Sequence, residues 1–80
     1  MDASDDRYPV VQELMAYWRA HPQASDTVEG ICRWWFAAGP SPQPVVQRAL
    51  AWLQEGGWVQ AHRQADGRVR YRLAEARPIP

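Results

Sequence analysis

The sequence predicts a mainly α-helical domain that ends in a small β-hairpin. Apolar residues recur at helical spacing in three separate stretches of the chain. After Gly57 the period of the apolar residues changes from about 3.6 to two, as it does in strands. The pair Asp66-Gly67 then separates two alternating stretches, and Asp-Gly is a strong signal for a hairpin turn. We therefore expect three helices followed by two antiparallel strands.

Length and composition indicate a single folded domain. A chain of 80 residues lies near the lower limit for a core that is stable by itself, and a hydrophobic fraction of 46% is too high for a disordered segment. A single cysteine, Cys32, excludes an internal disulfide and a cysteine-based zinc cluster. The sequence contains neither an apolar run long enough to cross a membrane nor an apolar signal segment. We expect no membrane partner and a cytoplasmic location.

The charged residues are distributed unevenly along the chain. Nine arginines balance nine acidic residues, and the absence of lysine fits the coding bias of a GC-rich, bacterial-like genome. Residues 1–40 carry three arginines against six acidic residues, whereas residues 41–73 carry five arginines against two. An acidic first half with a formal charge of −3 therefore precedes a basic second half with a formal charge of +3.

The first helix is predicted over residues 7–20, where one face is apolar. This face consists of Val10, Val11, Leu14, Met15 and Trp18. Pro22 ends the helix because the residue before a proline is disfavoured in the α region. The connection that follows, residues 21–25, has room for one or two sheet residues. Residues 1–6 are expected to form a disordered tail, although Asp6 can also cap the helix.

The second helix is predicted to begin near Asp26, which forms a capping-box-like pair with Glu29, and to end at about residue 37 or 38. Its apolar face consists of Val28, Ile31, Cys32 and Trp35. Gly39-Pro40 then breaks the chain before the next helix. A short break between two amphipathic helices is what a helix-turn-helix requires.

The third helix is predicted over residues 41–55, with Ser41 as its N-cap and prolines only in the first turn. Its apolar face consists of Val46, Ala49, Leu50 and Leu53. Gly56-Gly57 ends the helix, because glycine adopts the left-handed conformation at little steric cost. The opposite face carries a polar row of Gln43, Gln47, Arg48 and Gln54.

The hairpin is predicted over residues 58–73. Its inward row is apolar and consists of Val59, Ala61, Val69, Tyr71 and Leu73. The outward row of its second strand consists of Arg68, Arg70 and Arg72. Residues 75–80 are expected to form a loose tail.

These elements in this order resemble a winged helix-turn-helix domain. Three motifs carry the resemblance: Val46-Gln47-Arg48-Ala49-Leu50, the segment Leu53–Val59, and the segment Asp66–Leu73. The first resembles the V-x-R-x-L centre of the family's recognition helix. The second resembles the L-x-x-x-G-hydrophobic-hydrophobic exit into the wing. The third, D-G-R followed by Y-x-L, resembles the strand that closes the wing. The resemblance identifies a winged helix-turn-helix domain over residues 7–74, at the level of the superfamily.

The resemblance implies a winged helix, a three-helix bundle with a two-stranded wing, that binds double-stranded DNA as transcriptional regulators of this kind do. Helix 41–55 would enter the major groove and wing 58–73 would lie on the phosphates. The implied base-edge readers are Gln43, Gln47 and Arg48. The implied phosphate contacts are Arg63, Arg68, Arg70 and Arg72. The chain departs from the family pattern in its bulky Trp34-Trp35-Phe36, and in a recognition helix that has one cation and carries Trp52.

The alternative is a winged helix that binds proteins and has no specific DNA site. Five Trp, three Tyr and one Phe exceed what so small a core can enclose. We expect an exposed aromatic patch that docks a second copy or another protein. Its candidate residues are Tyr17, Trp34, Phe36 and Trp52. On this alternative the hairpin arginines are a solvated face, and Arg48 pairs with a carboxylate of the first half. RNA binding has less support.

The sequence gives little support for catalysis or for a bound cofactor. No nucleophile has a base at a meaningful spacing, and no glycine-rich phosphate loop is present. The acidic residues stand singly, and His21 and His62 lie far apart without a partnering cysteine. Cys32 lies on an apolar helix face, where a buried, inert thiol is expected. We therefore expect a protein that is not an enzyme and that holds neither a metal nor a cofactor.

Overall fold

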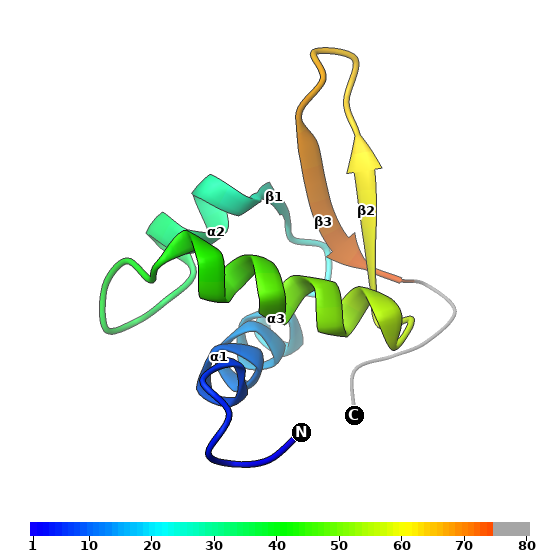
Figure 1. Cartoon of the computed structure of the whole chain (residues 1–80). Coiled ribbons are helices and arrows are strands. Elements are labelled where there is room, and N and C mark those ends of the chain that lie inside the picture. Colours follow the sequence, from blue (N-terminus) through cyan, green and yellow to red (C-terminus); the bar gives the residue numbers. More distant parts are fainter. Residues whose placement is uncertain (75–80) are drawn as a thin grey trace.

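The structure is a computed structural model that describes residues 1–74, and it consists of three α-helices and one antiparallel sheet (Figure 1). The elements follow the order α1 (Arg7–Ala20), β1 (Ser25–Thr27), α2 (Val28–Trp34), α3 (Gln43–Glu55), β2 (Val59–Arg63) and β3 (Val69–Leu73). The predicted helices and the predicted hairpin are confirmed, while the sheet has one strand more than the hairpin alone. The tail expected over residues 75–80 lies outside the described residues.

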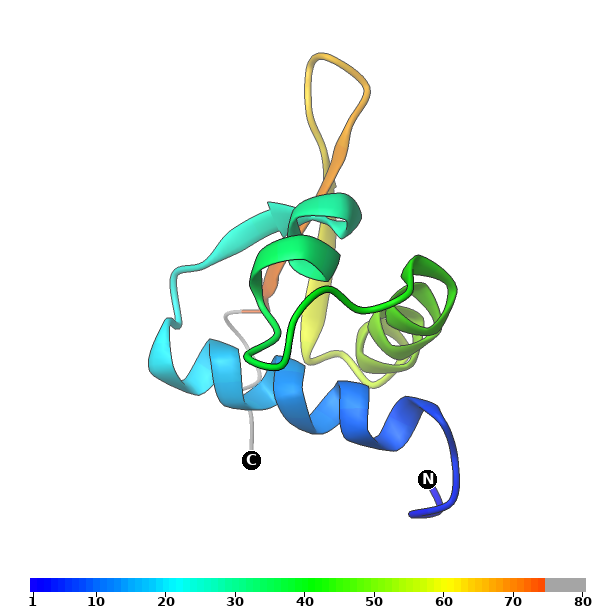
Figure 2. The same cartoon turned by 90° about the vertical axis from the view of Figure 1, so that its left-hand side faces the viewer.

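The three helices pack around one core, and the β2–β3 hairpin extends beyond them (Figures 1 and 2). The apolar faces predicted for the helices are buried in this core together with the start of β2, although Met15 and Val28 are only partly buried. The buried side chains are Val10, Val11, Leu14, Trp18, Ile31, Cys32, Trp35, Val46, Ala49, Leu50, Leu53 and Val59. One helix-borne core thus supports a hairpin that stands largely in solvent.

α1 has the predicted bounds and contributes the largest fully buried side chain, Trp18. Its indole Nε1 donates to the carbonyl of Ala24 at 3.0 Å, which satisfies the polar atom of the ring. Asp6 precedes α1 without a side-chain capping hydrogen bond. The segment before α1 forms a turn in which the backbone N–H of Asp5 donates to the carbonyl of Asp2 at 3.0 Å. Among residues 1–74 no helix is long and apolar enough to cross a membrane.

α2 is shorter than predicted, because it begins after Thr27 and ends at Trp34. Thr27, and not Asp26, is its N-cap: Thr27 Oγ1 accepts the backbone N–H of Gly30 at 3.2 Å. Asp26 instead belongs to β1, where its carboxylate accepts the backbone N–H of Thr27 at 2.8 Å. The prediction of an Asp26 cap was wrong because pairing with β3 holds Asp26 in the sheet.

α3 begins two residues later than predicted, and the N-cap position is Pro42, which makes no side-chain hydrogen bond. Ser41 therefore does not cap α3, and its backbone N–H donates to the carbonyl of Cys32 at 2.9 Å. The C-terminal end matches the prediction. Gly57 has a φ of 82°, and the N–H of Trp58 donates to the carbonyl of Leu53 at 3.1 Å, a Schellman closure that turns the chain into β2.

β3 is the central strand of the sheet and pairs with β1 on one side and β2 on the other. Directly opposed residues of antiparallel strands share a face. Leu73 opposes Val59 and Tyr71 opposes Ala61 on the inner face, from which Tyr71 and Leu73 pack against the core. The outer face, which points away from the core, consists of Ser25, Thr27, Gln60, His62, Arg70 and Arg72. Gly67, with a φ of 87°, forms the hairpin turn where the sequence predicted it.

Candidate nucleic-acid interface

One groove brings α3 and the hairpin together. Gln47 from the middle of α3 lines this groove with Gly67 and Arg68 from the hairpin turn. Thr27 at the end of β1 and Glu29 in the first turn of α2 also line it. We call it the helix–wing groove. Three separate segments of the chain thus present a glutamine amide, an arginine and a carboxylate to the same space. Val28, Val69 and Tyr71 also line the groove, so its surface is half polar and half apolar.

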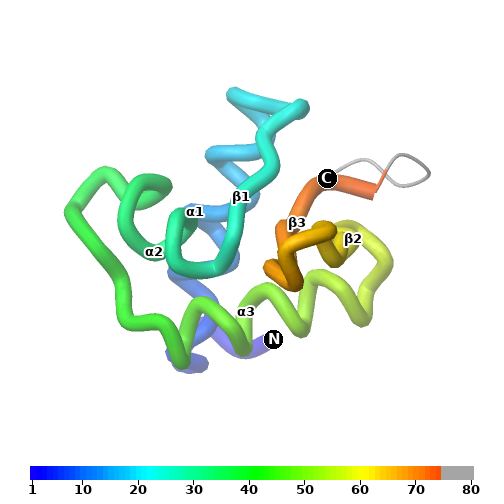
Figure 3. Tube along the Cα trace, turned by 90° about the horizontal axis from the view of Figure 1, so that it is seen from above, coloured from blue at the N-terminus to red at the C-terminus, as the bar shows by residue number. Residues whose placement is uncertain are grey.

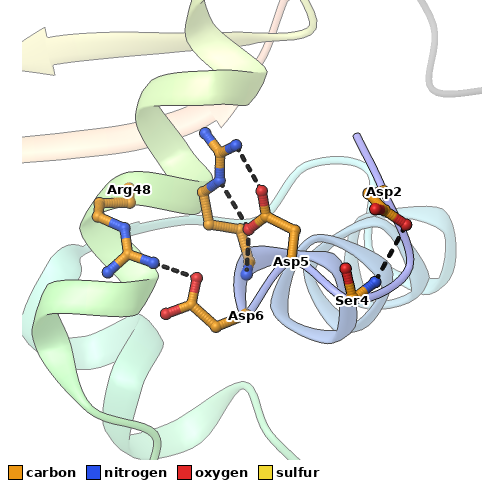
Figure 4. A network of polar contacts seen from close by, with 6 residues as sticks. Asp2, Ser4, Asp5, Asp6 and Arg48 are labelled. Carbon is orange, nitrogen blue, oxygen red and sulfur yellow. Dashed lines mark hydrogen bonds and ion pairs between the residues drawn. The ribbon is translucent and has the colours of Figure 1, made fainter.

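The polar row predicted on α3 is divided between two flanks of the helix. Successive helical residues point about 100° apart, so Gln47 faces the hairpin while Arg48 faces the segment before α1. Arg48 Nη2 forms an ion pair with Asp6 (Figure 4). The side chains of Arg48 and Asp6 remain 51% and 63% exposed, so the pair is a surface contact that solvent screens. Pairing of Arg48 with a first-half carboxylate, left open by the sequence, is therefore confirmed.

The four hairpin arginines are also divided. Arg63 opposes Val69 on the inner face of the sheet, whereas Arg70 and Arg72 lie on the outer face. Arg68 lies in the turn, where its Nε is 3.9 Å from a carboxylate oxygen of Asp66. The predicted phosphate contacts therefore do not form one row, because the pleat sends alternate side chains to opposite faces.

Arg70 is held in place by β1, which begins at Ser25 in the connection where the sequence left room for one or two sheet residues. Its Nη2 donates to the carbonyl of Ser25 at 2.6 Å, and its Nε donates to Ser25 Oγ at 3.4 Å. Both acceptors are neutral, and Arg70 forms no ion pair within residues 1–74. The guanidinium is thus oriented by β1 while its charge stays uncompensated by a carboxylate of the described chain.

Carboxylates interrupt the positive charge around α3 and the hairpin. Asp6 pairs with Arg48, Asp66 approaches Arg68, and Glu29 lines the helix–wing groove. Beside Asp6, the hydrogen bond from the Arg7 guanidinium lowers the pKa of Asp5 far below its ordinary value, so Asp5 stays ionised in this segment (Figure 4). The surface is therefore mixed in charge, and any polyanion must displace or avoid these carboxylates.

Of the four aromatic candidates, Trp34 alone is strongly exposed, at 71%. Tyr17 stacks on Trp35 with ring centroids 4.1 Å apart, and Trp52 packs near Trp58 at 5.6 Å. Phe36 is partly buried against the core as well. These three rings are therefore half-buried, and a docking patch that includes them stays a prediction.

Two further expectations concern reactive groups. Cys32 is buried, as predicted, and desolvation raises the pKa of its thiol, which keeps it in the weakly reactive neutral form. Within residues 1–74 no three His, Cys, Asp or Glu side chains gather in a way that could hold a metal ion.

Sequence reasoning missed two residues of this surface, Asp6 as the partner of Arg48 and Ser25 as the partner of Arg70. Each lies in a segment assigned to a tail or a connection. The acidic run before α1 was a usable signal for the first, whereas Ser-Asp-Thr carries no apolar alternation from which β1 could be found. Comparison of the chain with protein-family models, with curated proteins and with solved structures gives no match.

Proposed function

We propose that the chain is a winged-helix protein that binds double-stranded DNA, with α3 in the major groove and the β2–β3 hairpin as a wing on the phosphates. The observation that carries the proposal is the helix–wing groove, in which Gln47 lies with Gly67 and Arg68. A helix of 13 residues and a protruding hairpin form one surface there. Residues 41–73, which include both elements, carry a formal charge of +3.

Each polar residue of this surface has a distinct role in the proposal. Gln43 and Gln47 are exposed on α3 and offer paired donor and acceptor atoms that suit an adenine edge. Arg63 and Arg68 are exposed on the hairpin and offer charge to phosphates. Arg48 joins them once it leaves Asp6, and it then suits a guanine edge or a nearby phosphate. Such a protein would act in the cytoplasm of its cell, where it has access to DNA.

The test is a titration of a labelled random-sequence duplex with the full chain at two salt concentrations. Three arginines on this side, engaging about three phosphates, give a log–log salt slope of roughly −2.7. Arg63→Gln should reduce the size of that slope by about 0.9 and weaken binding to all sequences alike. Absence of binding at low salt would refute the proposal, since phosphate attraction persists there without a specific site.

A second candidate function, docking to a protein, has support from one residue. Trp34 is 71% exposed on the last turn of α2, and tryptophan is favoured at the centres of protein interfaces. The mixed charge around α3 also suits a protein partner better than it suits a polyanion. Tyr17, Phe36 and Trp52 are half-buried, so each exposes a smaller fraction of its ring to a partner than Trp34 does.

A further inference from the structure

The outer face of the sheet is basic and carries no carboxylate among its described side chains. Besides Thr27, which also lines the helix–wing groove, it consists of Ser25, Gln60, His62, Arg70 and Arg72, which the strand register brings together from three separate segments. In the register, His62 opposes Arg70 and Gln60 opposes Arg72, so each arginine has a hydrogen-bonding neighbour on β2. Arg70 takes part in none of the ion pairs formed within residues 1–74.

This face is also hollowed. His62, Gln64 and Arg72 line a hollow whose far side is formed by Gln23 and Ser25, from the connection between α1 and β1 and from β1 itself. Seen from above, that connection lies on the side of the sheet opposite to α3 (Figure 3). Most of the lining is polar and rich in N–H donors, whereas the centre of a protein–protein interface is apolar. Donors of this kind match phosphate oxygens.

Arg70 shows that part of this face has a fixed geometry. Its two hydrogen bonds to Ser25, at 2.6 Å and 3.4 Å, use the Nη2 and Nε atoms and leave Nη1 for another acceptor. Because both Ser25 acceptors are neutral, the guanidinium keeps its full charge. An arginine that is oriented in advance loses less conformational entropy when it binds an anion.

We propose that the outer face of the sheet binds the phosphate backbone of a second DNA duplex, so that one chain holds two duplex segments. The inference rests on the proposed function, since it takes α3 and the helix–wing groove as the first DNA surface. In that proposal the first duplex runs along α3, which lies on the opposite side of the sheet from the connection between α1 and β1 (Figure 3). The strand register turns Arg70 and Arg72 to the outer face of the sheet. The charge, the fixed arginine and the hollow therefore serve a second segment.

The experiment is a two-duplex capture with the full chain. A biotinylated 16-base-pair duplex is immobilised and loaded with protein, and a labelled duplex of unrelated sequence is then added at 0.1 M salt. Wild-type protein should retain the labelled duplex in proportion to the protein that is loaded. A labelled single strand of the same length serves as a parallel arm and should be retained less than the duplex.

Arg70→Gln and Arg63→Gln form a matched pair of variants. They remove the same charge from neighbouring positions of the hairpin, but from its outer and inner faces respectively. Arg70→Gln should lower retention of the labelled duplex about eightfold, because the loss of one phosphate contact weakens binding by about that factor at 0.1 M salt. Loading of the protein on the first duplex should stay within about twofold of the wild-type value. Arg63→Gln should instead lower loading and leave the retained duplex per bound protein unchanged.

Arg72→Gln provides a second outer-face variant, because Arg70→Gln also removes the hydrogen bonds to β1. Thermal unfolding followed by circular dichroism reports whether either variant has lost its fold. Retention of the labelled duplex by both outer-face variants would overturn the inference, since two associated copies would then hold the two duplexes. Loading without any capture by the wild type, or capture of the single strand alone, would also overturn it. Failure of the wild type to load on the first duplex would instead refute the proposed function.

Discussion

Two adjacent tryptophans at the end of α2 have opposite environments. Trp35 is 6% exposed, stacks on Tyr17 at 4.1 Å and meets Trp18 edge-on at 4.8 Å, whereas Trp34 is 71% exposed. We expect Trp35→Ala to lower the free energy of unfolding by about 3–5 kcal/mol, since it leaves a cavity and removes two ring contacts. Trp34→Ala should change it by less than about 0.5 kcal/mol. Chemical denaturation of both variants checks this, and equal losses would contradict the assignment of Trp35 to the core.

A second residue-scale prediction concerns the contact of Asp6 with Arg48. An exposed ion pair adds little to stability, but it occupies the single cation of α3. Asp6→Asn should therefore strengthen binding to random duplex and steepen the log–log salt slope by about 0.9, as Arg48 becomes available to a phosphate. Asp2→Asn is the control, because it removes the same charge from the same segment without touching Arg48. The same gain from Asp2→Asn would assign the effect to the net charge of the segment.

At the scale of single elements, Thr27 and Ser41 have similar side chains but different roles at the starts of α2 and α3. Thr27 Oγ1 caps α2 by accepting the N–H of Gly30, whereas Ser41 precedes α3 without a capping contact. Thr27→Ala should cost about 1 kcal/mol of stability, as the loss of an N-cap does. Ser41→Ala should cost less than about 0.5 kcal/mol, because its hydrogen bond to Cys32 uses the backbone N–H. Urea denaturation compares the two, and a Ser41→Ala loss as large as that of Thr27→Ala would show that the cap assignment is wrong.

The sheet shows how one element changes the role of another. β1 is three residues long, yet it pairs with β3 and orients Arg70 through hydrogen bonds to Ser25. The hairpin begins at Val59, one residue later than predicted, and ends at Leu73 as predicted. Arg70 and Arg72, which lie opposite β1, are only partly exposed. A short strand with little apolar area therefore decides which arginines stay freely extended into solvent and which are oriented.

At the scale of the whole molecule, the docking function predicts association through Trp34. Exposing apolar surface costs about 25 cal/mol per Å², so a partner that covers this ring gains free energy. Wild-type protein should sediment as a species larger than the monomer at high concentration, and Trp34→Ala should return it to the monomer. Tyr8→Ala is the control, since Tyr8 is a second exposed aromatic, at 38%, on a different helix. If the wild type sediments as a monomer at every concentration, the prediction that the protein associates with itself through Trp34 is wrong.

The sequence by itself determined the elements whose signals are local. The apolar faces of α1, α2 and α3 and the hairpin around Gly67 follow from spacings of two to seven residues, and the structure confirms them. Gly57 also ended α3 as predicted, because a left-handed closure is a property of one position. The same locality explains why the predicted N-caps Asp26 and Ser41 were wrong. Both residue types suit a cap, but contacts with distant segments decide where each helix begins.

The tertiary structure alone decided which of the candidate site residues lie together. Arg48 meets Asp6 across 42 positions of sequence, and Arg70 meets Ser25 across 45. The pleat of the sheet placed Arg63 and Arg70 on opposite faces, and contacts with Trp35 and Trp58 leave Tyr17 and Trp52 half-buried. Each of these outcomes depends on the free energy of contacts between distant segments, which no local spacing encodes.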